Sequence, residues 1–151
     1  GGELHTCRSA ELSENFDELA KDLCAYNTAL WLCGFALQNT GSGQDCRKFF
    51  QAVITGFRRL KQAITDTTLD ASAAKGILTA AVVVYLEENG LLPDGYNQPR
   101  VYEQRKTLVL VGLGQCAAPA LTSRNWDELF RWALRVLAFV ECRVPQYPKI
   151  T

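Results

Sequence analysis

Residues 71–86 read ASAAKGILTAAVVVYL, and this stretch decides the fold. It is apolar on nearly every face, whereas a helix at a protein surface carries a single apolar stripe. The stretch is shorter than the about 20 residues that span a bilayer. The run Val82-Val83-Val84-Tyr85 is also compatible with a buried strand, because periodicity does not separate the two for short apolar runs. The length of the stretch and its alanine-rich first half favour a buried central helix.

Segments with helical periodicity flank this central stretch on both sides. They predict helices over Asp45 to about Ile64, over Pro99 to Ala118, and from Ser123 or Asn125 to about Cys142. The pair Gly112 and Gly114 inside the second of these has no strand before it, so we expect close helix packing rather than a phosphate site. The sequence therefore predicts an all-α protein, a globular helical bundle around a buried central hydrophobic helix, with residues 9–143 as one domain.

The first helical region has two interpretations. Its apolar residues recur at steps of three and four, which puts them on one helix face. Ser9 to Gln38 is therefore compatible with one long helix. A break around Ala25 to Thr28 is equally compatible, because Asn27-Thr28 offers a new N-cap. The apolar residues of this face are Leu12, Phe16, Leu19, Leu23, Tyr26, Leu30, Cys33 and Leu37.

Composition limits the classes of partner. Lys plus Arg and Asp plus Glu both number 16 in 151 residues, so the formal net charge is zero and no basic field recruits nucleic acid or anionic lipid. A net charge near zero also leaves self-association, and so a homodimer, open. We expect residues 1–8 to be disordered, with Gly1-Gly2 typical of a cloning remnant, and residues 144–151 to form a short tail without an anchor. The expectation is a soluble protein with no membrane span.

The cysteines and titratable residues predict no reaction centre. The sequence has six cysteines but no C-x-x-C pair, and His5 is its only histidine, so we expect no metal site and no cofactor. Several cysteines lie among apolar residues, which favours free thiols in a reducing compartment over three disulfides. Adjacent carboxylates such as Glu87-Glu88 point to different helix faces and are interpreted as capping or solvent-exposed charges. We therefore predict that the protein is not an enzyme.

Three residue patterns resemble the Bcl (B-cell lymphoma) family of apoptosis regulators. The run NWDELF, with Trp126 and Phe130, resembles the start of the family's second homology motif. Gly76, near the start of the central helix, corresponds to the Gly of the family's Asn-Trp-Gly-Arg motif. Leu30 and Gly34 match the Leu-x-x-x-Gly core of the death-motif helix, which requires a break in the first helical region. The sequence departs from the family at Ile77, which stands where the motif has Arg.

The resemblance implies an inhibitor of apoptosis, cytoplasmic and of the viral survival type, that sequesters pro-death partners. Such proteins hold the amphipathic helix of a partner in a hydrophobic groove. The groove would lie beside the start of the central helix at Gly76, with Lys75 or Arg58 meeting an acidic residue of the partner. Each lining residue taken singly is more commonly core. The implied lining is Phe50, Val53, Ile54, Phe57 and Leu60, with Leu78 at the floor.

Two other classes stay open at this point. A secreted, disulfide-linked helical bundle with a cytokine-like role would use Ser9 to Gln38 as one long helix and would pair the six cysteines. A helical scaffold or dimerisation domain would expose Trp126, Trp132 and Phe139, although these aromatic side chains could equally pack inward.

Overall fold

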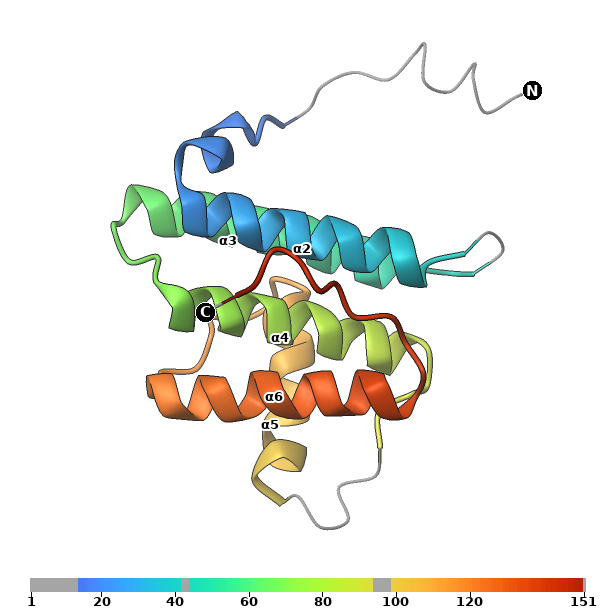
Figure 1. Ribbon diagram of the computed structural model, residues 1–151. Coiled ribbons are helices and arrows are strands. Elements are labelled where there is room, and N and C mark those ends of the chain that lie inside the picture. Colours follow the sequence, from blue (N-terminus) through green and yellow to red (C-terminus); the bar gives the residue numbers. More distant parts are fainter. Residues whose placement is uncertain (1–13, 42–43, 94–98, 151) are drawn as a thin grey trace, which may run out of the picture.

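The computed structural model describes residues 14–41, 44–93 and 99–150, with side chains outside residues 99–103. Within these ranges the chain is helical and has no strand, which confirms the predicted all-α bundle (Figure 1). The predicted disordered residues 1–8 and the predicted helix start at Ser9 lie outside the described ranges. The elements are η1 (Asp17–Lys21), α2 (Leu23–Asn39), α3 (Arg47–Thr65), α4 (Ala71–Glu88), α5 (Pro99–Gly112) and α6 (Ser123–Phe139).

Helix α4 is the central element. Its residues 78–86 are all buried, and it contacts α2, α3, α5 and α6. In Figure 1, α4 lies between α2 and α3 on one side and α6 on the other, while α5 crosses behind. The helix begins where the Asp70 side chain accepts a 2.8 Å hydrogen bond from Ala73 N, and it ends before Gly90, whose φ is +66°. The buried helix predicted for residues 71–86 is confirmed, with two further residues at its end.

The first helical region is broken, but not where the sequence indicated. Residues 17–21 form the 3-10 helix η1, and Asp22 then adopts an extended conformation. The Asp22 side chain accepts a hydrogen bond from Ala25 N at 2.9 Å and caps α2. The single long helix is therefore wrong for its described part, and the alternative break at Ala25 to Thr28 lies too far along the chain.

The face that α2 buries also differs from the predicted one. The predicted stripe continued through Leu23 and Leu37, which are 75% and 83% exposed. The side that packs on the core instead carries Ala25, Thr28, Trp31, Leu32 and Phe35. The reason is that residues 23–39 include no charged side chain, so the helix is apolar all round and its periodicity does not identify a buried face.

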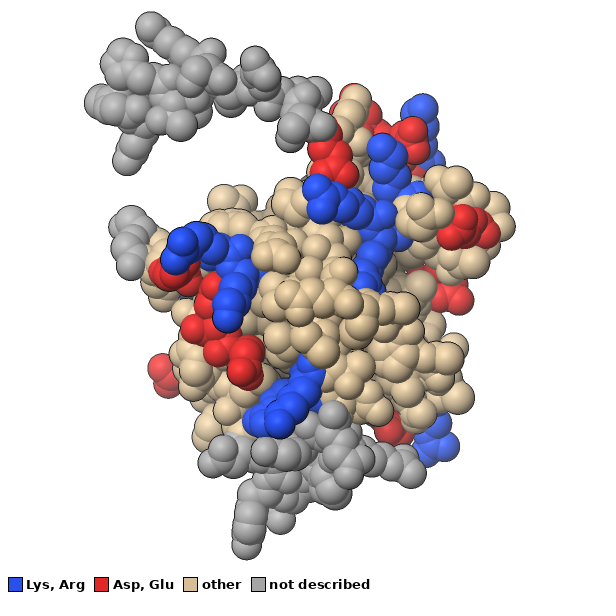
Figure 2. Space-filling view, turned by 180° about the vertical axis from the view of Figure 1, so that it is seen from behind, with Lys and Arg blue, Asp and Glu red and all other residues tan. Residues whose placement is uncertain are grey.

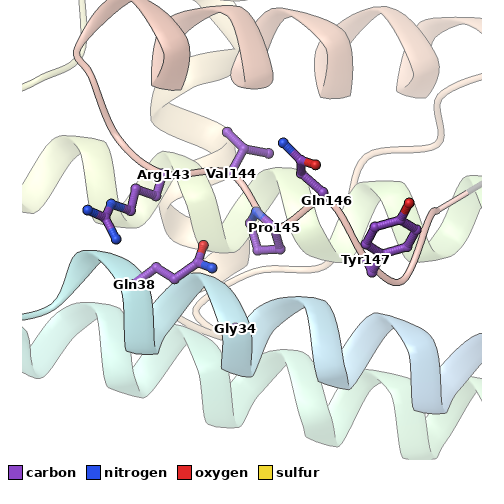
Figure 3. Close-up of a pocket in the computed structure, with 7 residues that line it drawn as sticks. All are labelled: Gly34, Gln38, Arg143, Val144, Pro145, Gln146 and Tyr147. Atoms are coloured by element: carbon purple, nitrogen blue, oxygen red, sulfur yellow. The ribbon is translucent and has the colours of Figure 1, made fainter.

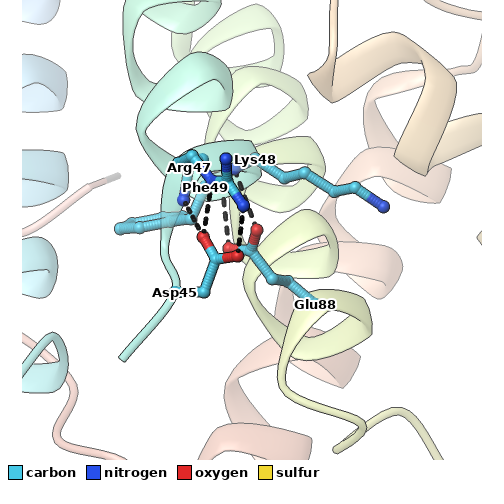
Figure 4. A network of polar contacts seen from close by, with 5 residues as sticks. All are labelled: Asp45, Arg47, Lys48, Phe49 and Glu88. Atoms are coloured by element: carbon cyan, nitrogen blue, oxygen red, sulfur yellow. Dashed lines mark hydrogen bonds and ion pairs between the residues drawn. The ribbon is translucent and has the colours of Figure 1, made fainter. Parts of the chain in front are cut away.

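Helix α3 begins after Cys46, and its first free N–H groups bind a side chain from another helix. The Glu88 carboxylate, at the end of α4, accepts hydrogen bonds from Lys48 N at 2.8 Å and Phe49 N at 3.1 Å (Figure 4). Asp45, at which the predicted helix begins, lies just before α3, and its side chain accepts a hydrogen bond from Arg47 N at 3.2 Å and forms an ion pair with the Arg47 side chain at 2.9 Å. A carboxylate at a helix N-terminus is favourable, so Glu88 joins the start of α3 to the end of α4.

Helix α5 is shorter than predicted because two glycines shape its end. A Cβ atom at Gly112 would lie 2.6 Å from a methyl group of Val84 and 2.8 Å from the carbonyl oxygen of Ala80, so α5 approaches α4 more closely than any other residue would permit. Gly114 then has φ +76°, and Gln115 N donates to Leu110 O at 2.9 Å. The predicted close packing is confirmed at Gly112, Gly114 lies exposed beyond the end of the helix, and the predicted extension to Ala118 is wrong.

The chain after α6 folds back onto the bundle. The helix ends at Phe139, three residues before the predicted Cys142, and Glu141 has φ +61°. The following segment crosses α4 between α2 and α6 (Figure 1). Val144 and Ile150 pack against the core and Pro145 is buried, so residues 144–150 belong to the packed domain. In the described part of the chain, no helix is both long enough and apolar enough to cross a membrane.

Candidate functional site

Residues that precede α2 lie on the second half of α3, beside one of the two predicted cations. The Glu14 carboxylate accepts three hydrogen bonds from the Arg58 guanidinium, at 2.8 to 3.0 Å. These hydrogen bonds lower the pKa of Glu14 below its ordinary value. One turn further along α3, Lys61 Nζ donates to the carbonyl oxygen of Asn15 at 3.2 Å. Arg58, expected to meet an acidic residue of a partner, thus meets an acidic residue of its own chain.

Two apolar side chains follow this acidic residue onto the same surface. The Phe16 ring packs edge-on against the Phe57 ring, with ring centroids 5.4 Å apart. Leu19 is 4% exposed and packs in a cluster that includes Leu60 of α3 and Ile77 of α4. Segment 14–19 therefore places on this surface the carboxylate of Glu14 and two apolar groups, Phe16 and Leu19, which are three residues apart.

We call the surface that receives this segment the α3 site. It is formed by three helices, since α3, α2 and the start of α4 all contribute to the cluster around Leu19. Ile77, which stands where the resemblance expects an Arg, is one of its residues. Because the Ile77 side chain is apolar, the positive charges of the site come from Arg58 and Lys61. The site consists of Ala25 and Ala29 of α2, Phe57, Arg58, Leu60 and Lys61 of α3, and Ile77 of α4.

The predicted groove lining divides between surface and core. Phe50 and Ile54 are 50% and 37% exposed, and Phe57 is half-buried. With Lys61 they follow steps of four, three and four residues, so they share one face of α3. The remaining predicted residues Val53, Leu60, Gly76 and Leu78 are buried in this conformation. The accessible part of the predicted lining is thus a strip along α3 that leads into the α3 site.

The second predicted cation is held elsewhere. Lys75 Nζ lies 2.7 Å from Asp127 Oδ1, and the pair joins the start of α4 to the first turn of α6. This hydrogen bond lowers the pKa of Asp127. The neighbouring Gly76 lies against Trp126, because a Cβ atom there would come 3.4 Å from the indole ring. Lys75 and Gly76 therefore belong to the contact between α4 and α6 rather than to the α3 site.

The remaining motif residues are not gathered at one place. Trp126 and Phe130 are buried, and the Phe130 ring lies 6.0 Å from the Trp31 ring of α2. Leu30 is 42% exposed, whereas a Cβ atom at Gly34 would lie 3.6 Å from Pro145. Of the aromatic residues considered for a dimerisation face, Trp132 is buried and Phe139 is 86% exposed. Two of the three motifs thus meet, since Gly76 lies against Trp126, whereas Leu30 is on the exposed side of α2 and Gly34 lies against the segment after α6.

An open hollow separates α2 from the last residues of the chain. Gly34 and Gln38 line it from α2, and residues 143–147 line it from the other side (Figure 3). Arg143 is the only charged residue of this lining, and Tyr147 is 76% exposed. The hollow brings together no acid–base pair, so we assign it no chemistry.

Charges and cysteines show no second site in the described ranges. On the face opposite to that of Figure 1, basic and acidic side chains lie intermixed around a broad uncharged area (Figure 2). No cluster of His, Cys, Asp and Glu among the described residues could hold a metal ion. Cys24, Cys33, Cys46, Cys116 and Cys142 are free. No family model matches the chain, and neither a curated protein nor a solved structure is significantly similar to it.

Proposed function

We propose that this protein binds the amphipathic helix of a pro-death partner at the α3 site and thereby inhibits apoptosis in the host cytosol, as a survival-type Bcl protein. The observation that carries the proposal is the position of segment 14–19. Its carboxylate meets Arg58 and its two apolar side chains, Phe16 and Leu19, pack on the cluster that α2, α3 and α4 form. A death-motif helix combines the same groups, since it carries apolar residues at i, i+3/i+4 and i+7 and an acidic residue.

A partner helix would replace segment 14–19 and extend beyond it. Its first apolar residues would take the places of Phe16 and Leu19, and its acidic residue would meet Arg58. Further apolar residues one and two turns away would cover Ile54 and Phe50, whose side chains are already exposed along the same face. Binding would bury these two side chains without unfolding the core.

The position of Arg58 on α3, rather than at the start of α4, implies that the protein binds only some death-motif helices. In the family the Arg at the start of the central helix pairs with the partner's Asp, whereas here Ile77 stands at that place and the cation comes from α3. An acidic residue set in the register of the family's usual ligand would then meet an apolar side chain rather than Arg58. Charge complementarity determines specificity more than affinity, so we expect binding to few death-motif helices.

Calorimetric titration of the full chain with a panel of death-motif peptides tests the proposal. We expect submicromolar binding to at least one peptide, and Arg58→Glu should weaken that binding by about tenfold or more, because two carboxylates would then face each other. Arg47→Glu is the matched control. Arg47 is also an arginine of α3 paired with an acidic residue, but it lies at the other end of the helix.

Two results would refute the proposal. One is the absence of binding across the panel by a sample whose circular dichroism shows the folded helical protein. The other is equal loss of binding in Arg58→Glu and Arg47→Glu, which would indicate a general effect of charge rather than a contact at the α3 site.

A further inference from the structure

The outer face of α2 carries a continuous apolar row. Leu23, Tyr26, Leu30 and Leu37 are 75%, 45%, 42% and 83% exposed, and Cys33 between them is also exposed. The five residues follow steps of three, four, three and four, which is the a/d spacing of a coiled-coil seam over two heptads. We call this row the α2 seam. A seam of this spacing is the surface onto which a second helix packs at a shallow angle.

The composition of α2 is that of a buried helix. Residues 23–39 include no charged side chain, as in the middle of the central helix α4. A helix that is apolar all round is normally covered on all sides. α4 is covered by four helices, whereas α2 is covered by η1, α3, α4 and the segment after α6 on its other sides only. An exposed apolar row of this length marks an interaction surface.

We infer that a second copy of this chain covers the α2 seam, so that the protein forms a two-fold symmetric dimer through α2. The seam is complementary to itself, because leucine stands at both ends and in the middle, and apolar residues on one seam fit between those of another. Neither the seam nor the rest of α2 carries a charge. The helix therefore has no charged group that would pair with a charged residue of a different protein. The chain has zero formal net charge, so two copies do not repel each other.

The symmetry determines how the two helices lie. A two-fold axis that crosses the seam runs the two α2 helices antiparallel, with the Leu30 side chains of both copies near the axis and Leu23 of each copy near Leu37 of the other. Antiparallel helices also place the N-terminus of each beside the C-terminus of the other, which is the favourable arrangement of helix dipoles.

The size of the seam indicates a weak but specific dimer. From Leu23 to Leu37 the seam is about 21 Å long, at about 1.5 Å per residue. Two heptads bury an area at the lower end of specific interfaces, so we expect a dissociation constant on the order of micromolar. Because α2 is already folded in the monomer, association does not have to order it. The seam shares no residue with the α3 site, so this inference does not rest on the proposed function.

Sedimentation equilibrium of the full chain in reductant tests the dimer without interference from Cys33 disulfides. The wild type should dimerise with a dissociation constant on the order of micromolar. Leu30→Glu and Leu30→Lys should each be monomeric, because like charges would meet near the axis, and an equimolar mixture of the two should dimerise again. Leu110→Glu is the matched control, because Leu110 is a leucine of α5 with the same 42% exposure, and it should dimerise as the wild type does.

Three outcomes would overturn the inference. They are a wild type that stays monomeric well above the micromolar range, a Leu30→Glu variant that dimerises as the wild type does, and a mixture of the two charged variants that stays monomeric. If circular dichroism shows that the Leu30 variants do not fold, Leu37→Glu and Leu37→Lys take their place, since Leu37 is 83% exposed.

Discussion

The Asn39 side chain and the Arg143 backbone, 104 residues apart in the chain, form a reciprocal pair of hydrogen bonds. Asn39 Nδ2 donates to the Arg143 carbonyl oxygen at 2.7 Å, and Arg143 N donates to Asn39 Oδ1 at 2.8 Å. Asn39 Nδ2 also donates to Phe35 O at 3.0 Å, at the end of α2. One amide side chain thus ends α2 and holds the start of the segment that returns across the bundle.

Replacement of Asn39 should loosen that segment. Asn39→Asp keeps the size of the side chain but directs a carboxylate oxygen at two carbonyl oxygens, so we expect unfolding to become easier by about 1–3 kcal/mol. Amide hydrogen exchange at Arg143 and in the residues that follow should accelerate more than exchange in α4. Gln38→Ala is the control. The exposed Gln38 precedes Asn39 and lines the hollow between α2 and residues 143–147, but its side chain makes no hydrogen bond within the described part of the chain. Equal exchange in the two variants would contradict this role of Asn39.

The sequence predicts the elements of this fold better than it predicts their contacts. The central helix was predictable because residues 71–86 are apolar on all faces and begin after a good N-cap, both of which are local properties. The close approach at Gly112 was predictable for the same reason, since two glycines, Gly112 and Gly114, lie two residues apart in the sequence. The sequence indicates a capping or solvent-exposed role for Glu88, but that it caps α3 was not predictable, because this contact joins residues from two helices that only the tertiary fold brings together.

The candidate site was predictable only in part, and α2 gives the reason. The stripe from Phe16 to Leu37 has a regular spacing, yet Phe16 and Leu19 face the bundle while Leu23 and Leu37 face away from it. The break at Asp22 turns the chain between the two pairs, and a helix without charged residues offers no signal for which face is buried. The contact of Glu14 with Arg58 likewise depends on that turn.

Titration of Tyr85 should appear in the stability at alkaline pH. Burial raises the pKa of Tyr85 to about 12, and its hydroxyl donates to the Asn39 carbonyl oxygen at 3.0 Å. In the unfolded chain the phenol ionises near pH 10, so between about pH 10 and 12 the unfolded state loses its proton first and the free energy of unfolding falls as pH rises. The stabilisation that the Tyr85 phenol contributes to the free energy of unfolding is fully present below about pH 10 and is lost as pH rises to about 12.

Tyr85→Phe removes the ionisation of this phenol, together with its effect on the neighbouring Cys142 thiol. Burial also raises the pKa of the Cys24 and Cys33 thiols, and their contribution is common to both proteins, whereas the Cys142 thiol forms a hydrogen bond with Tyr85 and loses it in Tyr85→Phe. Urea unfolding at a series of pH values should therefore give a steeper loss of stability for the wild type than for Tyr85→Phe between about pH 10 and 12. Parallel curves over this range would mean that Tyr85 ionises equally in both states.

Removal of the Glu14 charge should strengthen the binding proposed for the α3 site. A segment that occupies the site lowers the apparent affinity of any ligand by the fraction of time for which the site is free. Glu14→Gln keeps the shape of the side chain but removes its charge, so segment 14–19 should leave Arg58 more often, and a peptide that binds the wild type should bind a few-fold more tightly. Glu18→Gln is the matched control, because Glu18 lies exposed in η1 and makes no ion pair within the described part of the chain. Calorimetric titration of one binding peptide into the three proteins gives the comparison. Unchanged affinity in Glu14→Gln would mean that segment 14–19 and the peptide do not compete, so that the peptide binds elsewhere on the bundle.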